Sequence, residues 1–150
     1  MASDIYIHYG SNKFDKDLFQ PIKNRYFVKP DGGLWASSIN ARYGWKDWNK
    51  DTEFRECKEE NSFKFKLKAN AKVCIINSVK ELKLLPMENQ CPSLIGRQIK
   101  FLDFEKLITL GYDAMLVNIS SDYGLYWDLY GWDCDSLLVF NKDIIEECEE

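Results

Sequence analysis

Residues 62–68 read Ser-Phe-Lys-Phe-Lys-Leu-Lys, and this stretch has the clearest periodicity in the chain. Phe63, Phe65 and Leu67 alternate with three lysines. Because successive side chains of a strand point to opposite faces, the pattern predicts a strand with one buried and one solvated face. We interpret the lysine row as a solvated sheet face, since no aromatic residue shares that face to stack on nucleic-acid bases.

Other short apolar segments and several helical segments surround this strand. Strands are also predicted over residues 4–9, 25–28, 34–37, 72–76, 112–119 and 136–140. Helices are predicted over residues 39–49, 78–85 and 104–110. Ser37 or Ser38 would cap the first helix, and Asp103 the last. The remaining predictions are a turn at residues 29–33, a loop over 87–98 and a hairpin-like stretch over 120–135. This mixture predicts the α+β class.

The chain has 150 residues, 45% of them hydrophobic and 29% charged, which suits one domain with its own core. Its formal net charge is −4, but residues 141–150 hold one lysine and five acidic residues. The other 140 residues carry 19 basic and 19 acidic groups, so no global basic field favours nucleic acid as a partner. We therefore expect a single domain over residues 1–140 and a solvated acidic tail over residues 141–150.

The five cysteines form no CxxC pair, and the first 15 residues have neither a basic nor an apolar signal-like region. No apolar run approaches the roughly 20 residues that span a bilayer. These features predict reduced thiols, no membrane segment and a cytoplasmic protein.

His8 is the only histidine, which excludes zinc sites built on several histidines. It ends the first predicted strand, and strand ends are common places for binding sites. The chain also has 22 aromatic residues. The five tryptophans fall in two windows, Trp35, Trp45 and Trp48, then Trp127 and Trp132. Core packing for the tryptophans and a hydrogen-bonded structural role for His8 are the alternatives to a ligand site.

The order of four short motifs resembles the ADP-ribosyltransferase family, in its histidine-tyrosine-glutamate branch. These motifs are His-Tyr-Gly-Ser at residues 8–11, Gly-Gly-Leu-Trp-Ala-Ser at 32–37, LITLGYDAMLV at 107–117 and DCDSLLVFN at 133–141. The resemblance implies an α+β fold with a split sheet of short strands and a few peripheral helices. It also implies NAD as the cofactor. The chain departs from the family pattern in placing Tyr9 between the histidine and the glycine.

The resemblance assigns roles to several residues. His8 would donate a hydrogen bond to a ribose hydroxyl, and the backbone of Tyr9 or Gly10 would bind the nicotinamide carboxamide. One aromatic side chain would stack on the cationic nicotinamide ring, and a serine would add a hydrogen bond to its amide. The NAD-binding residues implied in this way are Tyr9, Gly10, Ser11, Trp35, Ser37, Tyr43 and Trp45.

The family's glutamate has no direct counterpart, because no glutamate occurs between Glu105 and Glu146. Counting back from Phe140-Asn141 places that position at Ser136, and a shift of one residue gives Asp135. Asp133 shares a strand face with Asp135. We favour Asp135 over Asp133 as the catalytic acid beside His8. A polar turn before a buried strand is the structural alternative for Asp-Cys-Asp.

Two functions follow from this resemblance. The first is an enzyme that transfers ADP-ribose from NAD to a macromolecular target, or that hydrolyses NAD, as a small effector or inhibitor protein. The second is a non-catalytic binding protein on the same scaffold, which blocks a partner protein or sequesters a nucleotide. The expected partners are NAD and a protein target.

Overall fold

The computed structural model describes residues 4–24, 30–53, 57–90, 99–129, 132 and 134–148. The strands of its larger sheet are β1 (Tyr6–Tyr9), β2 (Leu34–Ser38), β3 (Ser62–Leu67), β4 (Val73–Ile76), β7 (Ala114–Val117), β8 (Ser136–Val139) and β9 (Ile145–Glu147). A second sheet pairs β5 (Met87–Gln90) with β6 (Ile99–Leu102). The α-helices are α1 (Trp45–Thr52), α2 (Val79–Leu82), α3 (Phe104–Thr109) and α4 (Gly124–Asp128). Short 3₁₀ helices are η1 (Lys16–Leu18), η2 (Glu59–Asn61), η3 (Ile119–Ser121) and η4 (Lys142–Ile144).

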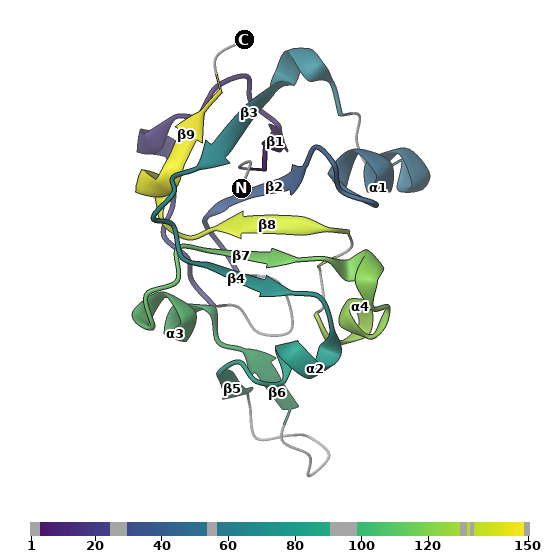
Figure 1. The fold of residues 1–150 in the computed structure, drawn as a ribbon, viewed down its shortest axis with the longest axis vertical. Coiled ribbons are helices and arrows are strands. Elements are labelled where there is room, and N and C mark those ends of the chain that lie inside the picture. The colour runs from purple at the N-terminus through teal and green to yellow at the C-terminus, as the bar shows by residue number, and fades with distance from the viewer. Residues whose placement is uncertain are drawn as a thin grey trace.

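The larger sheet has the strand order β4-β7-β8-β2-β1-β3-β9 (Figure 1). β4 and β7 run parallel, and the other neighbouring strands are antiparallel. In Figure 1 the arrows of β3 and β9 run at a steep angle to those of β8 and β7, so the sheet changes direction between its two ends. The predicted α+β class is confirmed.

Alternation in β3 is as predicted. Phe63 and Phe65 are 7% and 0% exposed, and the lysines between and after them are exposed. The strand places its phenylalanines against Tyr6 and Phe14 on one face. Burial of these rings therefore determines which face of β3 is turned inward.

The central strands are buried on both faces because two apolar clusters cover them. Met115 and Leu138 belong to a cluster with residues of α2, α3 and α4, whereas Ala114 and Leu137 belong to a cluster with Phe65. All four strand residues are fully buried. Alternate side chains of β7 and β8 thus enter different clusters.

Residues 111–113, Gly-Tyr-Asp, have a structural role at the start of β7. The carboxylate of Asp113 accepts hydrogen bonds from the Lys72 backbone N–H at 2.8 Å and from Asn141 Nδ2 at 3.0 Å. Its carbonyl oxygen accepts hydrogen bonds from the backbone of Phe140 and Asn141. Asp113 therefore connects the segment before β4 to the segment that follows β8.

The helix predicted over residues 39–49 begins later, at Trp45. Ser38 Oγ accepts from the Asn40 N–H in a local turn, which competes with helix formation. Gly44 is the N-cap, and the carboxylate of Asp47 accepts its N–H. Ser37 and Ser38, the predicted capping residues, lie instead within β2. From that strand, Ser37 Oγ accepts the N–H of Trp45 at the start of α1.

Two other predictions are also corrected. The stretch expected to be hairpin-like contains α4. The Asp122 carboxylate accepts the Gly124 N–H at the start of this helix, and Leu125 in the helix and Leu129 directly after it are buried. Residues 87–90 form β5 rather than a loop. Residues 25–28 and 91–98 of the predictions lie outside the described residues.

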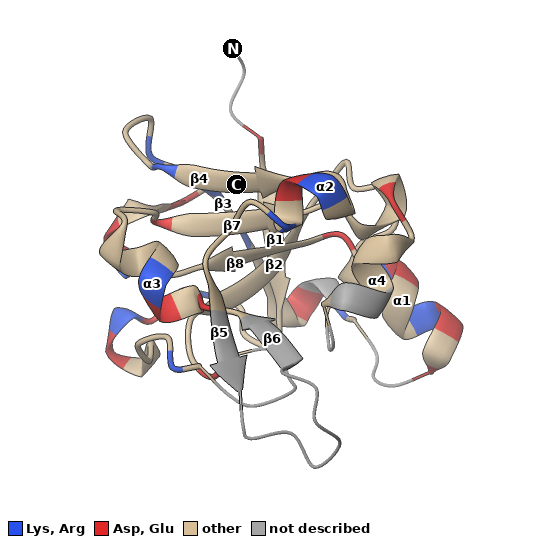
Figure 2. Ribbon diagram, turned by 90° about the horizontal axis from the view of Figure 1, so that it is seen from below, with Lys and Arg blue, Asp and Glu red and all other residues tan. Residues whose placement is uncertain are grey.

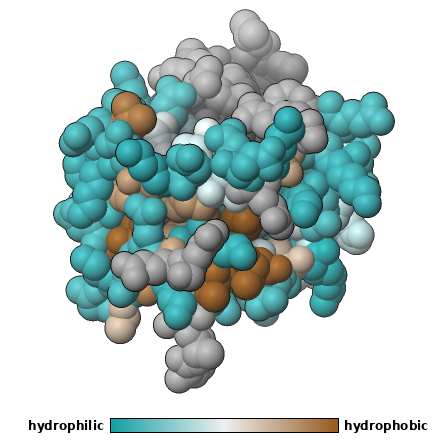
Figure 3. All heavy atoms as spheres, turned by 90° about the horizontal axis from the view of Figure 1, so that it is seen from above, coloured by the Kyte–Doolittle hydropathy of each residue, from teal (hydrophilic) through white to brown (hydrophobic). Residues whose placement is uncertain are grey.

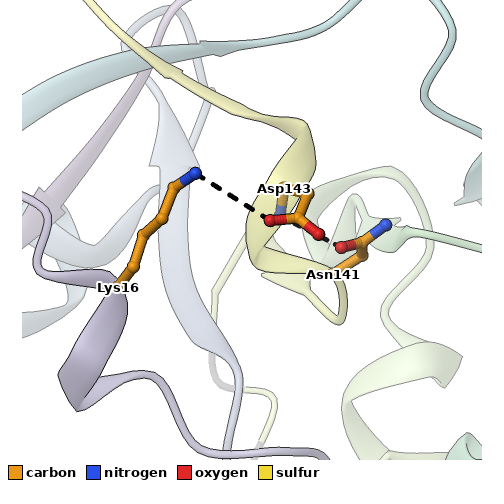
Figure 4. Close-up of polar contacts among 3 residues, drawn as sticks. All are labelled: Lys16, Asn141 and Asp143. Carbon is orange, nitrogen blue, oxygen red and sulfur yellow. Dashed lines mark hydrogen bonds and ion pairs between the residues drawn. The ribbon is translucent and has the colours of Figure 1, made fainter.

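The segment predicted as a solvated tail contributes to the sheet. Ile144 and Ile145 are 5% and 6% exposed, and Glu146 lies opposite Lys66 where β9 pairs with β3. Burial of the two isoleucines outweighs the solvation of the acidic residues around them. The segment begins at Asn141, whose side chain accepts the Asp143 N–H, and Lys16 lies 3.9 Å from the Asp143 carboxylate (Figure 4).

Charged and hydrophobic residues are arranged differently over the surface. Basic and acidic residues are interspersed on the face seen from below (Figure 2). The opposite face is mainly hydrophilic, with hydrophobic atoms grouped near its centre (Figure 3). None of the α-helices in the described ranges has the length and apolar character needed to cross a bilayer.

Candidate functional site

His8 lies where β1 and β2 separate. Two residue pairs, Tyr6↔Ser38 and Ile7↔Ser37, join β1 to β2, whereas the pairing of β1 with β3 continues to Tyr9. β1 therefore stays with β3 after Ile7 and leaves β2. Beyond Ile7 the backbone groups of β2 that face β1 are therefore open to a side chain.

The imidazole of His8 occupies that position. Its Nδ1 lies 2.6 Å from the carbonyl oxygen of Trp35 in β2, and its ring lies 5.3 Å from that of Phe63. Because a carbonyl oxygen can only accept, Nδ1 must carry the proton. Burial lowers the pKa of His8 from 6.5, although the hydrogen bond to Trp35 partly opposes this shift.

Neutral His8 therefore has Nε2 as an acceptor at pH 7. The resemblance predicted that His8 would donate a hydrogen bond to a ribose hydroxyl, and this geometry reverses the direction. A hydroxyl at the site would donate to Nε2. The direction is reversed because the only N–H of the neutral ring donates to the Trp35 carbonyl.

Gly10 leaves space beside this acceptor. Its φ is +127°, and an ideal Cβ at this position would lie 3.5 Å from His8 Nε2. Its N–H donates to the Asn61 carbonyl at 2.9 Å, so a contact with a carboxamide would have to come from the Gly10 carbonyl. Tyr9 lies opposite Ser62 in the ladder. Ser11 Oγ donates to the Lys13 carbonyl in an exposed turn.

An aromatic row connects the two tryptophan windows. Trp35 lies edge-on to both Trp45 and Trp132, with centroids 6.3 and 4.6 Å away. Trp45 also meets Trp48 edge-on, and Phe104 stacks on Trp132. Edge-to-face packing of this kind stabilises aromatic clusters beyond area burial. Core packing thus accounts for much of the tryptophan clustering.

Ser37 links the start of α1 to the start of β8. Its side chain is buried, and Oγ accepts from the Trp45 N–H at 2.9 Å and donates to the Asp135 carbonyl at 2.8 Å. Asp135 in turn donates its N–H to the Tyr43 carbonyl at 2.8 Å. The Ser37 hydroxyl, predicted to bind the nicotinamide amide, is therefore used within the protein.

Asp135 is 3% exposed, and its carboxylate accepts three hydrogen bonds. They come from the Ser120 N–H at 2.7 Å, Ser120 Oγ at 2.6 Å and the Tyr43 N–H at 3.2 Å. Sequence reasoning did not identify Ser120. Val117 of β7 lies opposite Ser136 of β8 in an antiparallel pair. A prediction that these two strands pair would therefore have placed residue 120 near residues 133–135.

Seven of the predicted site residues therefore form two groups, whose His8 and Ser37 side chains lie on opposite faces of the larger sheet. His8, Gly10 and the Trp35 carbonyl form the first group. The second group consists of Ser37, Tyr43, Trp45 and Asp135. Trp35 belongs to both, because its backbone carbonyl contacts His8 and its ring contacts Trp45 on the other face of the sheet. Asp133 lies outside the described residues.

His8 and Asp135 do not meet directly, because β2 lies between β1 and β8. Two strand spacings separate them laterally by roughly 10 Å. The hydroxyl of Tyr43, beside Asp135, donates a hydrogen bond to the Asp51 carboxylate at 2.9 Å. Within the described ranges, no group of three or more His, Cys, Asp and Glu side chains could hold a metal ion.

Comparisons with protein-family models, curated proteins and solved structures found no match to this chain.

Proposed function

We propose that this protein is an ADP-ribosyltransferase-like domain that binds NAD where β1 and β2 separate. It would transfer ADP-ribose to a macromolecular target or hydrolyse NAD. The observation that carries the proposal is the hydrogen bond between His8 Nδ1 and the Trp35 carbonyl at the divergence of the two strands. That bond orients the only imidazole of the chain and leaves Nε2 as an acceptor.

The surroundings of His8 suit the ribose of a nucleotide. A ribose hydroxyl is a donor, which matches the acceptor at Nε2. Gly10 contributes no side chain next to that atom, so ligand atoms can approach it closely. The pairing of β1 with β2 is short but continuous within the seven-stranded sheet, and the split sheet implied by the family resemblance stays a prediction.

The aromatic row packs on the opposite face of the larger sheet from the His8 imidazole, so NAD would contact both only by crossing the gap where β1 leaves β2. The nicotinamide ring of NAD is cationic, and the faces of tryptophan and tyrosine attract cations. The backbone carbonyl of Trp35 contacts the His8 imidazole, whereas the Trp35 ring packs against Trp45 on the other face of the sheet. Cleavage of the nicotinamide–ribose bond develops positive charge on the sugar, which a carboxylate would stabilise. Asp135 and Asp133 remain the predicted sources of that carboxylate.

A non-catalytic binding protein on the same scaffold is the second candidate. The observation that favours it is the environment of Asp135, whose carboxylate already accepts three hydrogen bonds within the protein. A carboxylate held in this way is less available to a ribosyl cation. In this case the protein would sequester a nucleotide or block a partner protein.

Calorimetric titration with NAD and an assay for released nicotinamide separate these possibilities. We expect NAD to bind the wild-type protein and His8→Ala to remove binding. Lys64→Ala is a matched control, because Lys64 is exposed on the neighbouring strand opposite Ile7 and should leave binding unchanged. Release of nicotinamide supports the enzyme, and binding without release supports the binding protein. No binding by the wild-type protein contradicts both NAD-dependent forms of the proposal.

A further inference from the structure

Asn49 is a buried polar side chain in α1. It is 4% exposed, and its amide nitrogen Nδ2 donates to the carbonyl oxygen of Trp45 at 2.8 Å. Because that carbonyl oxygen can only accept, the nitrogen of the side-chain amide must be the atom that faces it. The amide oxygen Oδ1 is buried and has no hydrogen-bond partner among the described residues. A buried acceptor without a donor is unfavourable, so a donor introduced beside Oδ1 would be bound favourably.

The sulfur of Cys57 is the second contact of this amide. Asn49 Nδ2 donates to Cys57 Sγ at 3.3 Å, across eight positions of the chain. Cys57 carries a thiol, is half-buried and lies between α1 and η2. Because Nδ2 and Oδ1 are bonded to the same carbon atom, the oxygen without a donor lies close to the sulfur. The site therefore combines a thiol, a donor directed at its sulfur and a nearby unused acceptor.

The two ends of the amide suit two forms of an oxidised cysteine site. An N–H donor favours negative charge on sulfur, and the thiolate is the form of cysteine that attacks electrophiles. A sulfenic acid, Cys–SOH, carries a new O–H group that can donate a hydrogen bond. Asn49 Nδ2 thus matches the attacking sulfur, and Oδ1 matches the oxidised product.

We infer that Cys57 is a site of reversible oxidation to sulfenic acid by a peroxide, and that Asn49 makes it the preferred cysteine. The Cys57 sulfur attacks one oxygen of hydrogen peroxide, so that an S–O bond forms and the O–O bond breaks. The sulfur is oxidised by two electrons, and the departing hydroxide takes up the thiol proton and leaves as water. The sulfenic O–H then donates to Asn49 Oδ1. This inference is independent of the proposed function, because NAD takes no part in it.

Exposure alone does not distinguish Cys57 from the other described cysteines. Cys74 and Cys134 are 5% and 0% exposed, whereas Cys148 is half-buried like Cys57. Cys148 directly follows β9, and its backbone N–H donates to the carbonyl of Lys64. A comparison of Cys57 with Cys148 therefore separates the effect of the Asn49 amide from that of an accessible thiol.

The first test uses the wild-type protein, so it does not depend on how a substitution affects folding. Hydrogen peroxide is added, sulfenic acid is trapped with a 1,3-dione, and peptide mass spectrometry identifies the labelled cysteine. Cys57 should be labelled about tenfold faster than Cys148, as expected for one hydrogen bond to a charged group. The difference should disappear in urea, where Asn49 no longer contacts Cys57. Equal labelling in the folded protein, faster labelling of Cys148, or a difference that persists in urea overturns the inference.

The second test compares Asn49→Ala with Thr52→Ala. Thr52 is a matched control, because its hydroxyl also donates to the carbonyl four residues earlier in α1, that of Trp48, from an exposed position. Asn49→Ala should slow the labelling of Cys57 to the rate of Cys148, and Thr52→Ala should leave it unchanged. An unchanged rate in Asn49→Ala, or an equal fall in both variants, overturns the role of Asn49.

The lifetime of the product tests the role of Oδ1. After peroxide is removed with catalase, the sulfenic acid of Cys57 should persist longer in the wild-type protein than in Asn49→Ala. The physical reason is the hydrogen bond that its O–H gains from a buried acceptor. Delayed addition of the 1,3-dione measures this lifetime. Equal lifetimes in the two proteins contradict the hydrogen bond to Oδ1.

Discussion

His8 Nδ1 lies 2.6 Å from the carbonyl oxygen of Trp35, a residue 27 positions later in the chain. The contact spans two strands that cease to pair after Ile7. A side chain thus satisfies a carbonyl at the point where the backbone ladder between these strands ends. The same contact orients the imidazole and decides which of its nitrogens can meet a ligand.

The protonation of His8 predicts a pH dependence of NAD binding. Burial lowers its pKa below 6.5, so the neutral ring persists to more acidic pH than in a free peptide. Protonation adds a second N–H at Nε2 and removes the acceptor for a ribose hydroxyl. NAD affinity, measured by calorimetry across pH, should stay constant near neutrality and fall as the pH drops through the lowered pKa.

His8→Gln is the control for this effect, because it removes the only histidine. Any residual NAD binding by this variant should lack the acidic decline, and an identical pH profile in both proteins would contradict the prediction. Stability should change in the same direction. The unfolded chain takes up the proton at higher pH than the folded protein, so the free energy of unfolding falls as the pH decreases below about 6.5.

Gly10→Ala should weaken NAD binding for a local reason. The new Cβ would lie 3.5 Å from His8 Nε2 and fill the space beside the acceptor. Gly111→Ala is the matched control, since Gly111 also has positive φ, at +95°, and no atom within 4 Å of an added Cβ.

Both substitutions should lower the free energy of unfolding by about 1–3 kcal/mol, measured by urea denaturation, because L residues rarely adopt such φ values. Only Gly10→Ala should reduce NAD affinity. Equal NAD affinity of the two variants would show that the space beside Nε2 is not used.

Tyr6 predicts a loss of stability at alkaline pH. Burial, with a smaller contribution from Asp4, raises the pKa of Tyr6 from 10.0 to about 12. Its stabilising contribution is complete below pH 10 and is lost as the pH rises toward about 12, because the unfolded chain ionises first. Urea denaturation at a series of pH values should show a shallower alkaline decline for Tyr6→Phe. Tyr126→Phe, at an exposed tyrosine, should leave the decline unchanged.

Asp113→Ala should destabilise the fold without touching the candidate site. The substitution removes the acceptor for the Lys72 N–H and for Asn141 Nδ2, at a cost of about 2 kcal/mol. Asp143→Ala is the control, because Asp143 is exposed and its ion pair with the exposed Lys16, at 3.9 Å, should contribute less than about 1 kcal/mol. Equal urea midpoints for the two variants would contradict this role of Asp113.

Features decided by neighbouring residues could be predicted from the sequence. The alternation at residues 62–68 predicted β3, and Asp103 caps α3 as expected by accepting the Lys106 N–H. The helix predicted over residues 78–85 forms as α2, and Ser78 caps it by accepting the Glu81 N–H. A period of two or a cap three residues from its donor depends on local geometry, so it can be recognised in a single segment.

Features that depend on distant segments were missed. β9 forms where Ile144 and Ile145 are buried beside β3. The acidic residues around these isoleucines made the segment look like a solvated tail in the sequence. α1 begins at Trp45 partly because Ser37, on β2, accepts its N–H. Neither segment contains enough information about its partner for the outcome to be predicted.

The sequence by itself determined the α+β class, the strand at residues 62–68 and the presence of one imidazole at a strand end. Only the tertiary structure decided that His8 Nδ1 donates to Trp35 and that Asp135 is held by Ser120 and Tyr43. The reason is physical: the tautomer of a histidine and the hydrogen bonds of a buried carboxylate depend on which groups strand order brings within 3 Å or so. Those groups lie 15 to 92 residues away along the chain.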